Sequence, residues 1–180
     1  TGGPSCARQH HLALGSRALD WHDGAWEHRP GGSGRELSWF PDPIGGAHCY
    51  RAALPDPLLL VPGFPDVTRV TARMEATRQD RFTSRLPMLT PPHPEGGLGA
   101  VRTEIRGVRA GTFVSRVYGA VERPAVGAAA VAAAAAERAL RGTLRRTGAG
   151  GLVEMLEPSS FLRDVRNRGL IVSVFEGAQI

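Results

Sequence analysis

The sequence has no lysine, and its 22 basic residues are all arginine. A P-loop for nucleotide phosphates is therefore excluded, because that loop requires a lysine. Asparagine occurs once, at Asn167, and isoleucine only four times, whereas alanine, glycine, proline and arginine are in excess. This bias is typical of GC-rich codons. We therefore attribute the arginines first to a bacterial GC-rich genome and only second to a polyanionic partner.

The net charge of +5 does not by itself indicate nucleic-acid binding. Proteins that bind nucleic acids usually gather positive charge on one face or along one helix. The arginines here are spread from Arg8 to Arg168 and alternate with acidic residues. Nucleic acid is therefore not an expected partner. Affinity for DNA that falls steeply with salt concentration would instead indicate nucleic-acid binding.

Cysteine is also scarce, with Cys6 and Cys49 only, and neither begins a CxxC pair. Unpaired thiols of this kind suit a reducing cytoplasm. The first residues lack a signal-peptide pattern, and the longest run of small apolar residues, 125–136, is too short for a membrane span of about 20 residues. We expect a cytoplasmic protein with a flexible tail over residues 1–14. Because the chain starts at Thr1, a longer precursor, a processed product and an expressed fragment all stay open.

Motifs for metals and dinucleotides are missing as well. The histidines form no H-E-x-x-H pattern and no zinc spacing with a cysteine, so no metal site is expected. The dinucleotide fingerprint G-x-G-x-x-G is absent, since the candidates that start at Gly32, Gly97 and Gly148 lack the last glycine. The nucleophile motif G-x-S-x-G is absent too. Asp20, His22 and Asp23 could in principle orient an acid-base pair, but neighbouring residues on a hairpin more often face opposite ways, so we predict no site there.

The patterns that are present predict an α+β fold in which glycine and proline separate short elements. Asp23-Gly24 predicts a tight hairpin turn, and residues 67–75 predict a strand. A helix is expected within residues 79–89, followed by a loop over 90–99. Two alternating segments, 100–107 and 112–122, predict a long hairpin with a loop over 107–111.

The C-terminal third predicts two helices and a strand. Pro124 suits the first turn of a helix that continues through nine alanines to residues 140–145. Ser159 or Ser160 would cap a second helix that stops at Gly169, before a strand over 170–176. We expect a single domain over residues 15–180, with a mixed, largely antiparallel sheet covered by the alanine-rich helix and the short C-terminal helix, and no complete Rossmann domain.

Candidate ligand contacts lie in the segment FPDPIGGAHCYR. Asp42, His48, Tyr50 and Arg51 combine proton donors and acceptors with a guanidinium that can bind a carboxylate. The alternative is an Asp-Pro turn flanked by surface residues. Further along, we expect the arginines of the long hairpin to lie on solvated sheet faces, paired with Glu104; these are Arg102, Arg106 and Arg116.

The order of these segments resembles the C-terminal portion of saccharopine dehydrogenase-like oxidoreductases. The resemblance runs from Glu36 to Glu176 and is carried by WFPDPIG, the hairpin VRTEIRGVRAGTFVSRVYGAV, the helix RPAVGAAAVAAAAAERALRG and the segment EPSSFL. It implies an N-terminal Rossmann domain that binds NAD or NADP, followed by an α+β domain for substrate and subunit contacts. Only the second domain matches this chain, so no cofactor-binding residue and no catalytic residue carries over.

The resemblance thus implies a substrate-binding or dimerisation domain, inactive alone, whose partners are a small-molecule substrate, a second copy and a nucleotide-binding domain of the same precursor. The alanine face would pack on the domain's own sheet, and residues 151–180 would dock on the nucleotide-binding half. The alternative is a noncatalytic ligand-binding or protein-interaction module.

Overall fold

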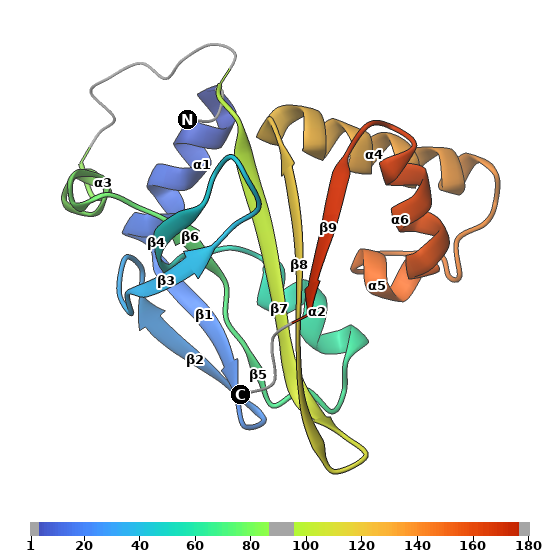
Figure 1. The fold of residues 1–180 in the computed structure, drawn as a ribbon, viewed down its shortest axis with the longest axis horizontal. Helices are drawn as coiled ribbons and strands as arrows, with labels where there is room; N and C mark the ends of the chain where they lie inside the picture. The colour runs from blue at the N-terminus through green and yellow to red at the C-terminus, as the bar shows by residue number, and fades with distance from the viewer. Residues whose placement is uncertain (1–3, 87–95, 177–180) are drawn as a thin grey trace.

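The α+β class is confirmed by a computed structural model, which describes residues 4–86 and 96–176 (Figure 1). The helices are α1 (Pro4–Gly15), α2 (Asp56–Leu60), the short 3-10 helix η1 (Val61–Gly63), α3 (Arg78–Thr83), α4 (Pro124–Leu140), α5 (Leu152–Met155) and α6 (Pro158–Arg166). The strands are β1 (Arg17–His22), β2 (Ala25–Pro30), β3 (Glu36–Trp39), β4 (Gly46–Arg51), β5 (Arg69–Val70), β6 (Arg73–Glu75), β7 (Gly99–Arg109), β8 (Thr112–Glu122) and β9 (Ile171–Glu176).

The described strands form three antiparallel sheets, where the sequence predicts one mixed sheet. Their orders are β2-β1-β5, β3-β4-β6 and β7-β8-β9. The strand predicted over residues 67–75 is divided between two of them, since β5 pairs with β1 and β6 pairs with β4. Sheets this small expose much of their area, which explains why the buried core is split into separate clusters.

The prediction of a flexible tail over residues 1–14 is wrong for residues 4–14, which belong to helix α1. Its last turn places Leu14 in a buried cluster with Tyr50 and Ala76. Its polar side also makes a contact, since His10 Nε2 lies 2.6 Å from the carbonyl oxygen of Glu75. These long-range contacts stabilise a helix that the polar sequence of the segment does not predict.

The predicted turn at Asp23-Gly24 is confirmed, with φ angles of 47° and 83° and the register His22 opposite Ala25. The long hairpin is confirmed too, but its loop is shorter than the predicted five residues. Arg109 lies opposite Thr112, so the loop consists only of Ala110 and Gly111, with φ angles of 51° and 78°. Such left-handed pairs match the twist of the adjoining strands.

Helix α3 confirms part of the helix predicted over residues 79–89. It begins after Thr77, whose hydroxyl accepts a hydrogen bond from the Asp80 N–H at 3.1 Å, while Asp80 Oδ2 accepts one from the Thr77 N–H at 2.8 Å. This capping box satisfies amide groups that a helix start otherwise leaves unbonded. The end of the predicted helix and most of the loop predicted over 90–99 lie outside the described residues.

The alanine-rich helix α4 begins at Pro124 as predicted, but its buried face packs on α6 instead of the sheet. Ala130 and Ala134 are the buried residues of α4, and Ala134 joins a core cluster with Phe161, Val165 and Leu156. Small side chains let two helices approach closely while a bulky partner such as Phe161 fills the space between them. Helix α6 is capped by Glu157, not by the predicted serines.

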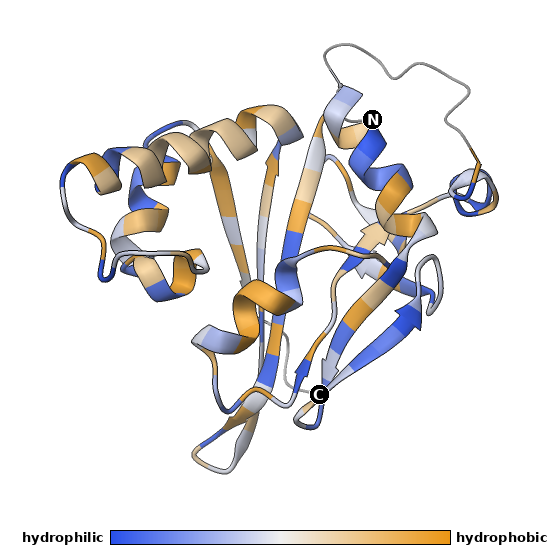
Figure 2. Cartoon of the chain, turned by 180° about the vertical axis from the view of Figure 1, so that it is seen from behind, coloured by the Kyte–Doolittle hydropathy of each residue, from blue (hydrophilic) through white to orange (hydrophobic). Residues whose placement is uncertain are grey.

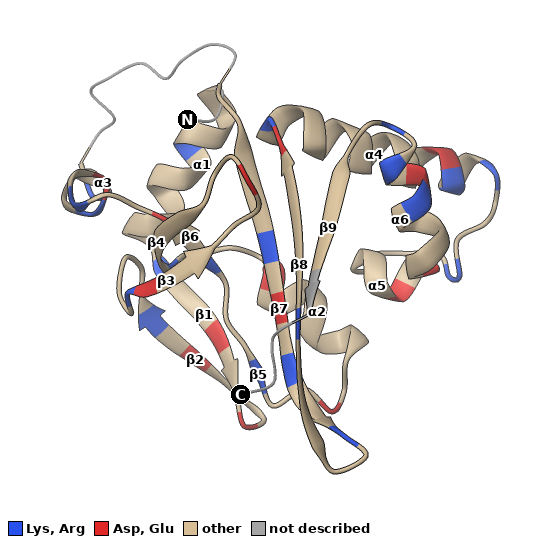
Figure 3. Cartoon of the chain, viewed as in Figure 1, with Lys and Arg blue, Asp and Glu red and all other residues tan. Residues whose placement is uncertain are grey.

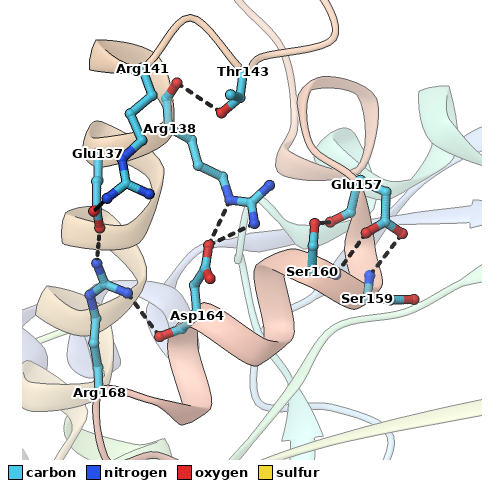
Figure 4. A network of polar contacts seen from close by, with 9 residues as sticks. All are labelled: Glu137, Arg138, Arg141, Thr143, Glu157, Ser159, Ser160, Asp164 and Arg168. Carbon is cyan, nitrogen blue, oxygen red and sulfur yellow. Dashed lines mark hydrogen bonds and ion pairs between the residues drawn. The ribbon is translucent and has the colours of Figure 1, made fainter.

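Ion pairs along the rim of this contact join α4 to α6 (Figure 4). The Arg138 side chain donates hydrogen bonds to Asp164 Oδ2 at 2.6 and 2.8 Å. Arg168 donates to Glu137 and, at 2.8 Å, to the carbonyl oxygen of Asp164. The two helices are therefore held by an apolar centre and a charged border.

Glu157 makes the stability of this region depend on pH. Backbone N–H groups of Ser160 and Ser159 donate to its carboxylate at 2.7 and 3.0 Å, and they lower its pKa from 4.5 to about 2. The carboxylate therefore stabilises the fold fully above pH ~4.5, and this contribution is lost as pH falls towards ~2. We expect Glu157→Gln to flatten the dependence of unfolding free energy on pH in that window, measured by urea unfolding. Parallel curves for the two proteins would contradict this.

Helices cover one face of the sheet β7-β8-β9 and leave the other without a helix. Seen from behind, the apolar helix α2 lies in front of β7 and β8 (Figure 2), whereas in the opposite view no described helix lies in front of these strands (Figure 1). Burial differs only in the middle of the sheet, where Gly119 is buried on one face while Val101 and Ile105 on the other are 69% and 55% exposed; towards the ends of the strands, both faces carry exposed apolar side chains. No helix in the described ranges could cross a membrane.

Candidate functional site

Strand β4 carries three of the four predicted ligand contacts, but the structure does not bring all four together. His48, Tyr50 and Arg51 lie on β4, where alternation points Arg51 away from the other two. Asp42 lies in the exposed turn between β3 and β4, at the far end of a strand that is roughly 17 Å long at about 3.4 Å per residue. Asp42 and Arg51 therefore cannot contact one small ligand.

Arginine side chains contact both Tyr50 and His48. Tyr50 is only 6% exposed, and the Arg81 guanidinium carbon lies 4.3 Å from the centroid of its ring. His48 is exposed, and its Nε2 lies 2.7 Å from a guanidinium nitrogen of Arg35. A cation over an aromatic face is favourable. The phenol thus belongs to the core, and only His48 of this pair faces solvent.

Arg51 makes the most buried ion pair among the described residues. Its Nε donates to Asp20 Oδ2 at 2.8 Å, and the two side chains are 20% and 6% exposed. The other carboxylate oxygen, Asp20 Oδ1, is inaccessible to solvent and has no hydrogen-bond partner within the described part of the chain. A buried carboxylate oxygen ordinarily has a donor. This one is therefore available to a donor that enters the site.

A second arginine lies directly opposite the first. Arg73 of β6 is the register partner of Arg51, so both side chains share one face of the sheet. Arg73 Nε binds Glu36 Oε2 at 2.9 Å, and Arg73 also donates to the carbonyl oxygen of Gly34. Two like charges in register repel each other. Asp20 and Glu36 offset this repulsion, one for each arginine.

The glycine-rich segment 31–35 closes over this pair. The Gly32 N–H donates to the Arg51 carbonyl oxygen at 2.8 Å, and the Arg51 N–H donates to the Ser33 carbonyl oxygen at 2.9 Å. Gly34 has a φ of 62°, and a Cβ at this position would collide with the guanidinium of Arg51. A side chain at this position would require the guanidinium end of Arg51 to shift, and the left-handed backbone conformation favours glycine.

A row of charges on β7 forms a separate feature (Figure 3). Glu104 accepts hydrogen bonds from Arg106 at 2.5 Å and pairs with Arg102 at 2.7 Å. The Arg106 hydrogen bond, opposed by burial and helped by Arg102, lowers the pKa of Glu104. The expected pairing with Glu104 is therefore present for these two arginines. Arg116 differs, because it lies opposite Ile105 and so shares the other face of the sheet.

Asp20 and Arg73 are the functional candidates that sequence patterns do not single out. Asp20 lies 31 positions before Arg51 in the sequence. Arg73 lies beside Arg51 only because β4 pairs with β6. The one signal in the sequence is the glycine-rich GGSG, which tolerates the close approach of a backbone to an arginine. The described residues hold no group of three or more histidine, cysteine or acidic side chains placed for a metal ion.

The arrangement can bind a small molecule that carries both an acidic and a basic group. Arg51 and Arg73 offer guanidinium N–H donors for a carboxylate, and Asp20 Oδ1 offers an acceptor for an amine or hydroxyl. Entry would require the segment 31–35 to move, because Gly34 lies against Arg51.

No family model and no curated protein matches the chain.

Proposed function

We propose that this chain is the substrate-binding or dimerisation domain of a saccharopine dehydrogenase-like oxidoreductase that uses NAD or NADP. The domain is not catalytic alone, and a nucleotide-binding domain of the same precursor supplies the cofactor site. In this proposal the Asp20–Arg51–Arg73 group is the substrate contact, in place of the predicted set with Asp42 and Tyr50.

The observation that most supports the proposal is the order and pairing of the elements in the second half of the chain. A long hairpin, an alanine-rich helix, a short helix and a last strand follow one another as the resemblance implies. Dinucleotide-binding domains need parallel strands joined by helices, with phosphates bound at a helix N-terminus. Every strand pair among the described residues is antiparallel. This chain therefore suits the half of such an enzyme that does not bind the nucleotide.

Titration with NADH and NADPH tests the proposal. We expect that the fluorescence of NADH and of NADPH does not change with this chain and that neither gives a binding isotherm, because residues 4–86 and 96–176 contain no glycine-rich strand-to-helix turn that could bind the pyrophosphate. The matched control is a protein in which a Rossmann domain encoded upstream of Thr1 precedes the chain, and that protein should bind one of the two. Saturable binding by the chain alone with a Kd of about 1 µM, which corresponds to a binding free energy of about −8 kcal/mol, would overturn the proposal.

A further inference from the structure

The turn of the long hairpin projects beyond the other described elements at its end of the molecule (Figure 1 and Figure 2). Strand β9 ends at Glu176, opposite Arg116, so past this pair β7 and β8 pair only with each other among the described strands. We call residues 105–116 the hairpin tip, and its residues from 105 to 113 are all exposed. The hairpin tip can therefore contact a partner without any change in the fold.

Apolar side chains of the hairpin tip lie on both of its faces. Val108 and Phe113 are register partners on one face and are 73% and 60% exposed. On the other face Ile105 is 55% exposed and lines, with Gly107 and Val114, a shallow hollow of about 150 Å³. A partner that covered one face of the sheet would leave the other face in water. Apolar side chains on both faces of one end instead suit an end that enters an apolar medium.

The hairpin tip also carries positive charge on both faces. Between residues 104 and 122 the sequence contains no acidic residue but three arginines, which are Arg106, Arg109 and Arg116. Cross-strand register places the first on the face with Phe113 and the other two on the face with the hollow. Each face therefore combines apolar side chains with at least one guanidinium group.

Two carboxylates lie beside these arginines, but they do not cancel the charge. Glu104 accepts a hydrogen bond from Arg106 at 2.5 Å and pairs with Arg102 at 2.7 Å, so two guanidinium groups share one carboxylate. Glu176 is the register partner of Arg116. One positive charge therefore remains beside Glu104 when both carboxylates are paired.

Arg109 adds a second positive charge next to the turn, since it is exposed and forms no ion pair with a described residue. Two further acidic residues, Asp23 and Asp66, belong to the β1–β2 turn and to the segment between η1 and β5. The turn of the long hairpin reaches beyond both of these segments in both views (Figure 1 and Figure 2). The part that projects furthest at this end is therefore apolar and positive.

We propose that the hairpin tip inserts into the surface of a lipid bilayer that contains anionic lipids. This is an interfacial contact and not a membrane span. Peripheral segments bury apolar side chains about 5–10 Å deep, which corresponds to about two or three residues of each strand at about 3.4 Å per residue. At that depth Val108 and Phe113 enter the apolar layer, whereas Arg106 and Arg116 stay at the level of the phosphates. The methylene groups of Arg109 remain in the apolar layer while its guanidinium reaches back to a headgroup.

Duplex DNA is the other polyanion that a two-stranded ribbon can bind, in the major groove. Most contacts in such a complex are made by basic and polar side chains with phosphates and bases. In the hairpin tip the exposed pair nearest the turn on one face, Val108 with Phe113, is apolar. The side chains at the turn therefore favour a bilayer over DNA.

Flotation of the whole chain with lipid vesicles tests the proposal. We expect binding to phosphatidylcholine vesicles that contain about 30% phosphatidylserine, and binding at least about fivefold weaker to phosphatidylcholine alone, because arginines near an anionic surface are attracted to it. Phe113→Ser should weaken binding at least about tenfold, because the burial of the ring is lost. Phe82→Ser is the matched control, since Phe82 is 83% exposed on α3, away from the hairpin tip (Figure 1), and this variant should bind as the original chain does.

A pair of arginine variants tests the charge. Arg109→Gln should lower the affinity for the anionic vesicles about fivefold, because one guanidinium next to the bilayer is lost. Arg163→Gln removes an exposed arginine from α6 and should leave the affinity unchanged. Both positions are exposed, so the thermal unfolding midpoints should stay those of the original chain.

An environment-sensitive maleimide label shows which part of the chain enters the bilayer. In the double variant Cys6→Ser with Val108→Cys, the label at residue 108 should shift its emission to the blue when anionic vesicles are added. The same label on Cys6 of the original sequence, in α1 at the other end of the molecule (Figure 1), should not respond.

Failure to bind anionic vesicles, undiminished binding by Phe113→Ser, or a label at residue 108 that does not respond would each overturn the proposal. Tighter binding to duplex DNA than to the vesicles would overturn it as well. The proposal goes beyond the oxidoreductase domain proposed above, and none of these results depends on the outcome of the NADH titration.

Discussion

Replacing Arg51 by alanine is expected to lower the free energy of unfolding by about 3–5 kcal/mol. The substitution leaves the carboxylate of Asp20, whose side chain is 6% exposed, without its charged partner. It also removes a side chain that lies between the segment 31–35 and the sheet. Urea unfolding followed by the fluorescence of Trp21, the strand neighbour of Asp20, measures the loss directly.

Two further variants distinguish the effect of breaking the buried ion pair from the effect of removing any arginine. Arg29→Ala breaks the exposed pair with Glu27 and should cost no more than about 1 kcal/mol. The double variant Asp20→Leu with Arg51→Met removes both charges and should be more stable than Arg51→Ala, because no buried charge remains. If Arg51→Ala proved as stable as Arg29→Ala, the buried pair would not stabilise the fold.

Phe161→Ala is expected to have a loss of similar size, about 3–5 kcal/mol. The ring is 7% exposed and fills the contact between α6 and the small side chains of α4. The alanines around it cannot extend into the vacated space, so a cavity would remain. Thermal unfolding should show a midpoint lower by roughly 10 °C, at about 2–4 °C per kcal/mol for a chain of this size.

The control for Phe161 is the same substitution at an exposed ring. Phe82 is 83% exposed on α3, and Phe82→Ala should change the unfolding free energy by no more than about 0.5 kcal/mol. Equal losses at the two positions would mean that the α4–α6 contact does not contribute to the cooperative unfolding of the chain.

Sequence patterns predict the elements whose determinants are local. The turn at Asp23-Gly24, the long hairpin and the start of α4 at Pro124 depend on backbone preferences of a few neighbouring residues, and all three are confirmed. The loop of the long hairpin is mispredicted because Ala110 adopts a left-handed conformation that favours glycine or asparagine. The cap of α6 is mispredicted because the Glu157 carboxylate reaches both serine amides.

The parts that sequence patterns miss depend on contacts between distant segments. Helix α1 is stabilised by the burial of Leu14 near Tyr50, and the division of residues 67–75 between two sheets depends on β1 and β4. The candidate site shows the same limit. Arg51 is predicted from its own chemistry, but Asp20 and Arg73 become its neighbours only once β1, β4 and β6 have assembled.

The buried thiol of Cys49 determines how this protein can be labelled. Cys49 is 2% exposed, and burial raises the pKa of its thiol, so it holds little of the thiolate that reacts with maleimides. Cys6 on α1 is the more exposed of the two cysteines. Because the sequence has no lysine side chain that could react with the maleimide, a fluorophore or spin label can be attached to Cys6 of α1 in the original sequence, without first removing a cysteine from β4.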